Sequence, residues 1–460
     1  MVIENNMSTN FVLNDDNGTP PKFERKVVDF QDIERRFTNT TTDYAKQFFH
    51  IYSCRLEELR PYLSERAQKK WGDVKLLKLP EVENFENERC IIIGTLFKHQ
   101  LWKPSILREL GEDTDEPNIT IEKHDNYCSE KDQPFLEDGT SRIKLVGSKV
   151  VITEIITGVV CAILGKKLEN GSFDVEDWCF AGCPPHSSIQ SPPASGKLLL
   201  ISGLDLVNNY KTLPLNLFVE WINGMAGTVE SQRDVASVVN VLIAGNSIKS
   251  TRSEMQSSKG LTESKAQETA AANEISSATA KLDELMSEIV TNCCVTLMPG
   301  QYDPTNVMLP QRPIQRFMLR ESSKYKSFKG VSNPWVGSIG NRLIGGSSGQ
   351  PIEDILRVSG DTDITPIQWL ERTLDWRHYS PTAPDTLPAY PFHVRDLFIM
   401  QECPDIYFVG NTDKFETKLW KGEEGQTVRL VCIPKFSTTS TAVIIDLETL
   451  ETTTISFGVN

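Results

Sequence analysis

The chain contains 460 residues, of which 39% are hydrophobic and 24% charged, and its formal net charge is −14. This length allows two or three domains with sizeable cores, and the composition is ordinary for a soluble globular protein. The acidic balance argues against broad binding to nucleic-acid backbones, because that affinity comes mainly from Lys and Arg displacing counterions. A local basic patch, for example over residues 66–70, stays open, although solvated helix charge is the commoner explanation of such a run.

Ten cysteines are too sparse for a disulfide framework in a chain of this length, and Cys179, Cys183, Cys293 and Cys294 lack the C-x-x-C pairs of structural zinc sites. We therefore expect reduced thiols and no metal or other cofactor. Residues 1–10 lack the features of a signal peptide, and the longest apolar stretch is too short and too polar to span a bilayer. An intracellular protein with no membrane association is expected.

The N-terminal part is predicted to contain a flexible tail and a helical arm. Residues 1–28 are rich in Asn, Asp, Gly and Pro, which favours a flexible tail. Within 29–75, apolar residues recur at spacings of three and four, which predicts helices. These residues are Tyr44, Phe48, Tyr52, Leu56, Leu59 and Leu63. Pro61 fits the first turn of a second helix, so we expect the helical arm to be divided there.

Residues 76–183 are predicted to be rich in β-strands. Branched residues favour strands over 89–97, 142–147, 156–166 and 173–181, and Asn-Gly at 170–171 predicts a tight hairpin turn. A small Greek-key barrel would account for this pattern. Binding of single strands would need exposed aromatic residues beside positive charge, which Phe97-Lys98 and Trp102-Lys103 offer. The acidic connection between these strands favours protein docking or structural packing instead.

Residues 184–195 form a linker rich in proline and serine, and a second domain is predicted over 196–460. Strands over 197–204, 238–244 and 295–299 alternate with an amphipathic stretch and a long helix, as in an α/β sheet. The long helix carries an apolar stripe that we expect to pack on the sheet, formed by Ala271, Ile275, Ala278, Leu282, Leu285 and Ile289. Strands over 428–433 and 441–447 are expected to complete the sheet structure. Glycine-rich residues 345–349 lack the frame of a nucleotide loop and predict a structural turn.

Four apolar runs of this domain break at glycine into polar residues, over 197–206, 238–246, 295–303 and 405–413. Open α/β sheets bind ligands at the carboxyl ends of their strands, so these breaks are expected to converge on one rim. The rim is the natural place to look for chemistry.

In their order and their placement at strand ends, the polar residues of these breaks resemble the five metal-binding signatures of the calcineurin-like metallophosphoesterases. The resemblance places former metal-site positions at Gly203, Asp205, Asn246, Lys249, Gln301, Tyr302, Asp303, His378, Asn411 and Asp413. A two-metal phosphoesterase needs carboxylate and imidazole ligands around ions about 3.5–4 Å apart. Neutral residues and Lys249 occupy most of these positions, so the resemblance implies a degenerate domain with no catalytic residue and no metal ligand. His378 is more simply explained as a hydrogen-bonded core or rim residue.

A wider set of motifs resembles the small, non-catalytic B-subunits of eukaryotic DNA polymerase delta. The motifs occur in order at 93–98, 104–108, 175–181, 243–246, 298–306, 380–387 and 402–408. The family implies a mixed fold: a helical arm, an oligonucleotide/oligosaccharide-binding (OB) barrel over 76–183, and an inactive phosphoesterase sandwich of two sheet layers over 196–460.

The same resemblance implies a function as a nuclear accessory subunit in DNA replication and repair synthesis. Such a subunit would join the cysteine-rich C-terminal domain of the catalytic subunit to a third polymerase delta subunit, with weak or absent direct DNA contact. The related B-subunits of polymerases alpha and epsilon are alternatives, but residues 93–97 and 380–386 favour delta. A single-strand-binding OB protein and a metal-dependent phosphoesterase are the competing hypotheses, and the phosphoesterase would require the ligands that are missing.

Overall fold

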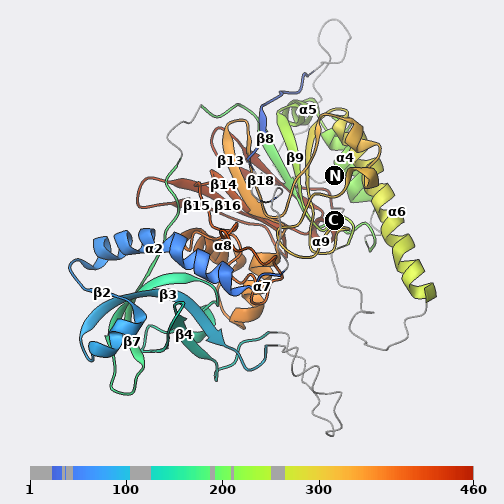
Figure 1. Cartoon of the computed structure of the whole chain (residues 1–460). Helices are drawn as coiled ribbons and strands as arrows, with labels where there is room; N and C mark the ends of the chain where they lie inside the picture. Colours follow the sequence, from blue (N-terminus) through green and yellow to red (C-terminus); the bar gives the residue numbers. More distant parts are fainter. Residues whose placement is uncertain are drawn as a thin grey trace, which may run out of the picture. The chain divides into compact units, whose positions relative to one another are not determined.

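A computed structural model describes residues 23–33, 37, 45–103, 126–186, 192–208, 212–249 and 265–458. Most of the predicted tail and residues 187–191 of the predicted linker lie outside these ranges. The chain divides into two compact units, one formed by 1–40, 185–350 and 402–460 and the other by 41–184 and 351–401 (Figure 1). We call the first the two-sheet unit and the second the barrel unit.

This division differs from the predicted continuous domain over 196–460, because residues 351–401 belong to the barrel unit. Hydrogen bonds explain the difference. Arg55 donates to Asp396 Oδ2 at 2.5 Å, and Lys98 Nζ donates to the carbonyl oxygen of Val358 at 2.7 Å. Such long-range partners cannot be recognised in the sequence of either segment.

The barrel unit contains a closed β-barrel. Its strands are β2 (Leu76–Leu77), β3 (Arg89–His99), β4 (Gln133–Glu137), β5 (Arg142–Val146), β6 (Val160–Lys167) and β7 (Phe173–Phe180). They follow the order β2-β3-β4-β5-β7-β6, and an additional β3–β6 pairing closes the ring. The strands predicted from branched residues are present, although β6 begins later than predicted. Strand β4 was not predicted, because the acidic connection around it conceals a short strand.

Helix α2 (Phe49–Trp71) packs on this barrel. Its buried residues Leu56, Leu59 and Leu63 form a core cluster with Ile91 and Ile93 of β3 and with residues of β6. The predicted break at Pro61 is wrong, because Pro61 lies inside one continuous helix. Pro61 is on the exposed side, and the buried stripe continues on both sides of it, so packing outweighs the hydrogen bond that proline removes. The unit also holds α8 (Pro366–Asp375) and most of α7 (Gln350–Ser359).

The two-sheet unit contains two six-stranded sheets. The first has the order β11 (Phe328–Gly330), β10 (Cys294–Met298), β9 (Val238–Ala244), β8 (Lys197–Ile201), β17 (Thr441–Asp446) and β18 (Thr452–Ser456). The second has the order β1 (Phe30–Asp32), β12 (Trp335–Ile339), β13 (Arg342–Ser347), β14 (Ile406–Thr412), β16 (Thr427–Pro434) and β15 (Glu416–Lys421). The predicted C-terminal strands thus belong to different sheets, β16 to the second and β17 to the first.

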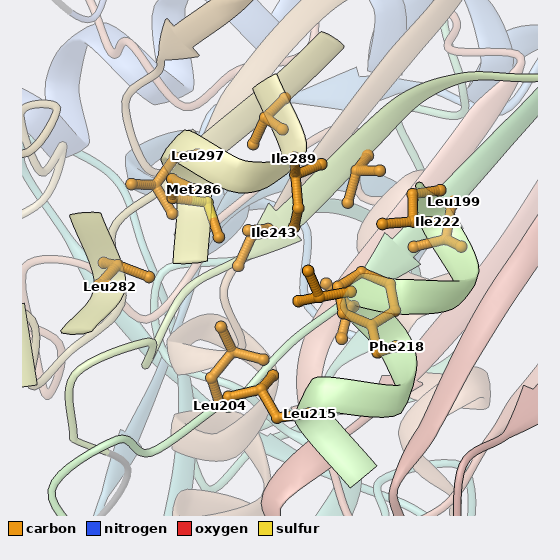
Figure 2. Packing of buried hydrophobic residues seen from close by; sticks show 14 of the residues in the cluster. Leu199, Leu204, Leu215, Phe218, Ile222, Ile243, Leu282, Met286, Ile289 and Leu297 are labelled. Atoms are coloured by element: carbon orange, nitrogen blue, oxygen red, sulfur yellow. The ribbon is translucent and has the colours of Figure 1, made fainter. Parts of the chain in front are cut away.

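Two hydrophobic layers hold the two-sheet unit together. Between the sheets, Leu198 and Leu242 pack in one cluster with Trp335 and Phe408. On the other face of the first sheet, a second cluster joins the strands to α4 (Thr212–Ile222), α5 (Val229–Ala236) and α6 (Lys265–Val290). Figure 2 shows this second cluster, with side chains of α4 and α6 beside those of β8, β9 and β10.

The predicted apolar stripe of α6 packs on the sheet over its C-terminal part only. Ala278, Leu282 and Ile289 are buried, whereas Ala271 is exposed. Met286, which the predicted stripe did not include, is also buried in the cluster. Among the helices of the described ranges, none is long and apolar enough to cross a membrane.

The buried stripe of α6 yields a stability prediction. Leu282→Ala should lower the free energy of unfolding by about 2–5 kcal/mol, because a fully buried leucine leaves a cavity when it is truncated. The neighbouring exposed Lys281→Ala should change it by no more than about 0.5 kcal/mol. Urea unfolding followed by circular dichroism measures both. Equal effects of the two substitutions would contradict the packing described for α6.

Candidate functional site

The loops after β8 and β9 are joined by backbone hydrogen bonds. The Gly203 N–H donates to the Gly245 carbonyl at 2.9 Å, and the Asp205 N–H donates to the Asn246 carbonyl at 3.2 Å. Gly203 has a φ of +61°, and a Cβ there would lie 2.7 Å from Asn411 Oδ1. Glycine is therefore required at this position both by the backbone conformation and by the space available. The structure brings these predicted rim residues together.

Asp303 ties the loop after β10 to the loop after β9. Its buried carboxylate accepts N–H groups from Ile248 at 2.8 Å, Gly300 at 2.8 Å and Ser247 at 3.2 Å. Burial raises the pKa of Asp303 above its ordinary value, although these N–H groups act in the opposite direction. Both carboxylate oxygens are thus engaged in holding the backbone.

Asn411, near the C-terminal end of β14, makes the corresponding connection. Its Nδ2 donates to the Ala244 carbonyl at 3.1 Å and to the Ser348 carbonyl at 2.7 Å, and its N–H donates to Ser202 Oγ at 2.9 Å. Its Oδ1 is buried and has no hydrogen-bond partner among the described residues. A neutral amide therefore links three strand ends.

The structure also places the remaining predicted positions of this unit. Asn246 Oδ1 accepts the Tyr302 N–H at 3.4 Å, and Asp205 Oδ1 accepts from Asn208 Nδ2 at 3.0 Å. Asp413 is exposed and pairs with Lys435 Nζ at 3.1 Å. Lys249, Gln301 and Tyr302 are half-buried.

A buried network of neutral amides supports the rim, and the sequence analysis missed it. Asn333 Nδ2 donates to Gln311 Oε1 at 2.7 Å and to Gln350 Oε1 at 2.9 Å, and its Oδ1 accepts the Ser348 N–H at 3.0 Å. Gln311 Nε2 donates in turn to the Gly300 carbonyl at 3.0 Å. The only sequence signal was the polarity of the Ser-Ser-Gly-Gln stretch that ends at Gln350.

His378 lies in the barrel unit rather than in the unit that holds the other predicted positions. Its Nε2 is 2.9 Å from Asp396 Oδ2, and its Nδ1 accepts the Ser380 N–H at 3.1 Å. The acceptor role of Nδ1 assigns the proton to Nε2, which therefore donates to Asp396. This arrangement agrees with the interpretation of His378 as a hydrogen-bonded core residue.

Arg55 of α2 completes this buried cluster, and the sequence analysis did not single it out. It is fully buried, and besides Asp396 it donates to the carbonyls of Gly158, Pro381 and Ala383 at 2.8, 2.8 and 2.7 Å. Burial acts to raise the pKa of Asp396, but Arg55 and His378 hold it well below its usual range. Arg55 thus joins α2, the barrel and the segment 377–401.

The rim combines neutral amide and backbone groups with the buried carboxylate of Asp303. Among the residues that the structure describes, no group of three or more His, Cys, Asp or Glu side chains is placed to hold a metal ion. Where the strand-end loops come closest to one another, the residues in contact include glycines and asparagines. The buried carboxylate of Asp303 accepts backbone N–H groups. The arrangement serves to fix strand ends to one another.

His378 yields a prediction on pH dependence. Burial, reinforced by Arg55, lowers the pKa of His378 from 6.5 to about 4. The unfolded chain therefore binds this proton more tightly, so stability should be complete above about pH 6.5 and fall towards pH 4, by on the order of 3 kcal/mol. His378→Gln should flatten the stability profile of the barrel unit between pH 6.5 and pH 4.5, measured by urea unfolding.

The matched control is His393→Gln, which changes an exposed histidine of the same unit and should keep the wild-type profile. A profile that His378→Gln leaves unchanged would show that this histidine does not govern stability in this range.

Two family models match different parts of the chain. The family of B-subunits of DNA polymerases alpha and epsilon matches residues 198–417, and the DNA polymerase delta subunit OB-fold domain matches residues 47–178. The barrel unit therefore contains an OB-fold domain, as the family resemblance implied.

Full-length relatives point to one polymerase. DNA polymerase delta subunit 2 of Drosophila melanogaster is 38% identical over 95% of this chain and 99% of its own length. The DNA polymerase delta small subunit of Arabidopsis thaliana is also 38% identical, over 95% and 97% of the two chains. The corresponding small subunit of Saccharomyces cerevisiae is 27% identical over 97% of each. The chain therefore belongs to the family of DNA polymerase delta small subunits.

Proposed function

We propose that this chain is the non-catalytic accessory subunit of a nuclear DNA polymerase delta complex and acts in DNA replication and repair synthesis. The observation that carries the proposal is the 38% identity over 95% of the chain to a DNA polymerase delta subunit. The similarity extends through both units, so it concerns the whole chain rather than one shared domain.

We further infer that the two-sheet unit is an inactivated calcineurin-like phosphoesterase domain. Its strand ends are held by Asp303, Asn411 and backbone contacts, which supports a structural use of positions where a phosphoesterase would bind metal. Gly203, Asn246 and Gln301 offer no carboxylate or imidazole for such a site.

The proposed scaffold joins the cysteine-rich C-terminal domain of the catalytic subunit to a third subunit. Each unit exposes large apolar side chains suited to protein contact. In the barrel unit, Phe49 is 58% exposed and Val394 is 80% exposed; in the two-sheet unit, Leu213 is 54% exposed and Met225 is 75% exposed. These side chains support docking of partners but do not assign either partner to a unit.

The structure weakens the alternative that the barrel itself binds single strands. The lysines of the Phe97-Lys98 and Trp102-Lys103 pairs are both engaged within the barrel unit. Lys98 is buried, and Lys103 Nζ lies 2.5 Å from Asp385 Oδ1. In addition, the Arg142 guanidinium covers the Phe97 ring at 4.6 Å and the Phe135 ring at 5.3 Å. We therefore favour protein docking for the barrel unit.

Assembly tests the proposed function directly. Co-expression with the cysteine-rich tail of the catalytic subunit should give a complex that co-elutes in size exclusion, and should raise the thermal midpoint of this chain, because a partner that binds only the folded state stabilises it. An unrelated cysteine-rich metal domain serves as the control partner. Failure of the cognate tail to co-elute, or co-elution of both tails alike, would contradict the scaffold function.

Hydrolysis provides a separate prediction. The purified chain should not turn over a phosphodiester with manganese, zinc or magnesium, and Gln301→Asn or Asn411→His alone should not create activity, because catalytic ligands act as a unit. A colorimetric phosphodiester assay measures this. Turnover that disappears in Asp303→Ala would refute the inactive domain, whereas turnover that survives this change comes from a contaminating enzyme.

A further inference from the structure

The two-sheet unit contains a strongly basic segment. Residues 312–329 contain six cationic residues and one acidic residue, although the chain as a whole carries a net charge of −14. All six cationic side chains are exposed; they belong to Arg312, Arg316, Arg320, Lys324, Lys326 and Lys329. A field of one sign over so short a stretch attracts polyanions.

The apolar side of this segment is anchored in the core. Ile314 and Leu319 are buried in the cluster that contains α6, and Met318 packs against it. Asp283 of α6 accepts the N–H groups of Glu321 and Ser322, both at 2.9 Å. The segment is therefore fixed, with Ile314, Met318 and Leu319 packed against the core and its cations outward.

The anchoring also brings the basic residues close together. Two short 3₁₀ turns, η4 (Arg316–Met318) and η5 (Ser322–Lys324), are joined by a hydrogen bond of 3.4 Å from Ser323 Oγ to the Arg316 carbonyl. Arg320 Nε donates to the Phe317 carbonyl at 3.3 Å. Arg316, Arg320 and Lys324 thus lie within one small surface region.

Two aromatic rings are exposed among these cations. Phe317 is 70% exposed and Tyr325 is 42% exposed. Lys324 pairs with Glu321 at 2.7 Å, and no other cation of the segment forms an ion pair within the described ranges. Exposed aromatic rings between unpaired cations are the combination that single-stranded nucleic acids require, since phosphates meet the charge and bases stack on the rings. An acidic peptide would need the charge but not the rings.

We propose that residues 312–329 form a binding surface for single-stranded nucleic acid. Arg316 and Arg320 contact backbone phosphates, and Phe317 and Tyr325 stack on bases. The surface is local, so it is compatible with a chain whose net charge of −14 argues against broad nucleic-acid binding. The proposal concerns the two-sheet unit alone and is independent of partner assembly and of the absence of hydrolysis.

Fluorescence anisotropy with a labelled oligothymidylate of twenty nucleotides tests the proposal on the full chain at several salt concentrations. The double variant Arg316→Glu with Arg320→Glu should weaken binding about tenfold or more and make the salt dependence shallower, because phosphate contacts are lost. Phe317→Ala should weaken binding about fivefold or more at unchanged salt slope, because it removes stacking only. Duplex DNA of the same length should bind more weakly than the single strand.

The matched control is the double variant Lys131→Glu with Lys149→Glu, which reverses the charge of two exposed lysines of the barrel unit. It changes the net charge of the chain by the same amount at a different place. It should alter binding less than about twofold. Absence of binding, or equal loss in the control variant, would overturn the proposal. If polyglutamate displaces the labelled strand as effectively as unlabelled oligothymidylate does, while Phe317→Ala leaves binding unchanged, the surface is a site for acidic protein. That result would also overturn the proposal. Thermal melts of all variants verify that each is folded.

Discussion

The two-sheet unit depends on the close approach of its strand-end loops. A Cβ at Gly300 would lie 2.2 Å from the Asn246 nitrogen, and one at Gly245 would lie 2.8 Å from the Gly300 Cα. Contacts this short exclude any side chain, so the loops meet backbone to backbone. The parallel order of β8, β9 and β10, with β14 in the second sheet, supplies the polar ends that meet there.

Side-chain hydrogen bonds to the backbone hold this junction. Asp303 accepts backbone N–H groups of the neighbouring loops, and Asn411 donates to carbonyls of two strand ends. In a two-metal enzyme, cations would balance converging carboxylates at such a place. Here the amides of Asn333, Gln311 and Gln350 form hydrogen bonds with one another behind the loops.

The sequence predicted the elements whose signal is local. The apolar runs that end at Gly203, Gly245 and Gly300 gave three parallel strands and the position of their loops, and the periodicity around Leu282 gave α6. What it could not give are partners distant in the chain. An arginine within a helical pattern is ordinarily expected at the surface. Only the fold reveals that Asp396 and three backbone carbonyls surround Arg55. Asn333 and Gln350 were likewise unremarkable polar residues. The outward cations of residues 312–329 were present in the sequence, but their joint exposure required the structure.

We propose that hydrogen bonds of Asp303 and Asn411, rather than bound metal ions, hold the strand ends of the two-sheet unit. Thermal unfolding of the purified chain, with excess chelator and then with millimolar manganese or zinc, tests it most directly, because a metal that binds only the folded state raises the midpoint. We expect the same midpoint in all three conditions. A saturable rise with metal that Asp303→Asn abolishes would contradict the account.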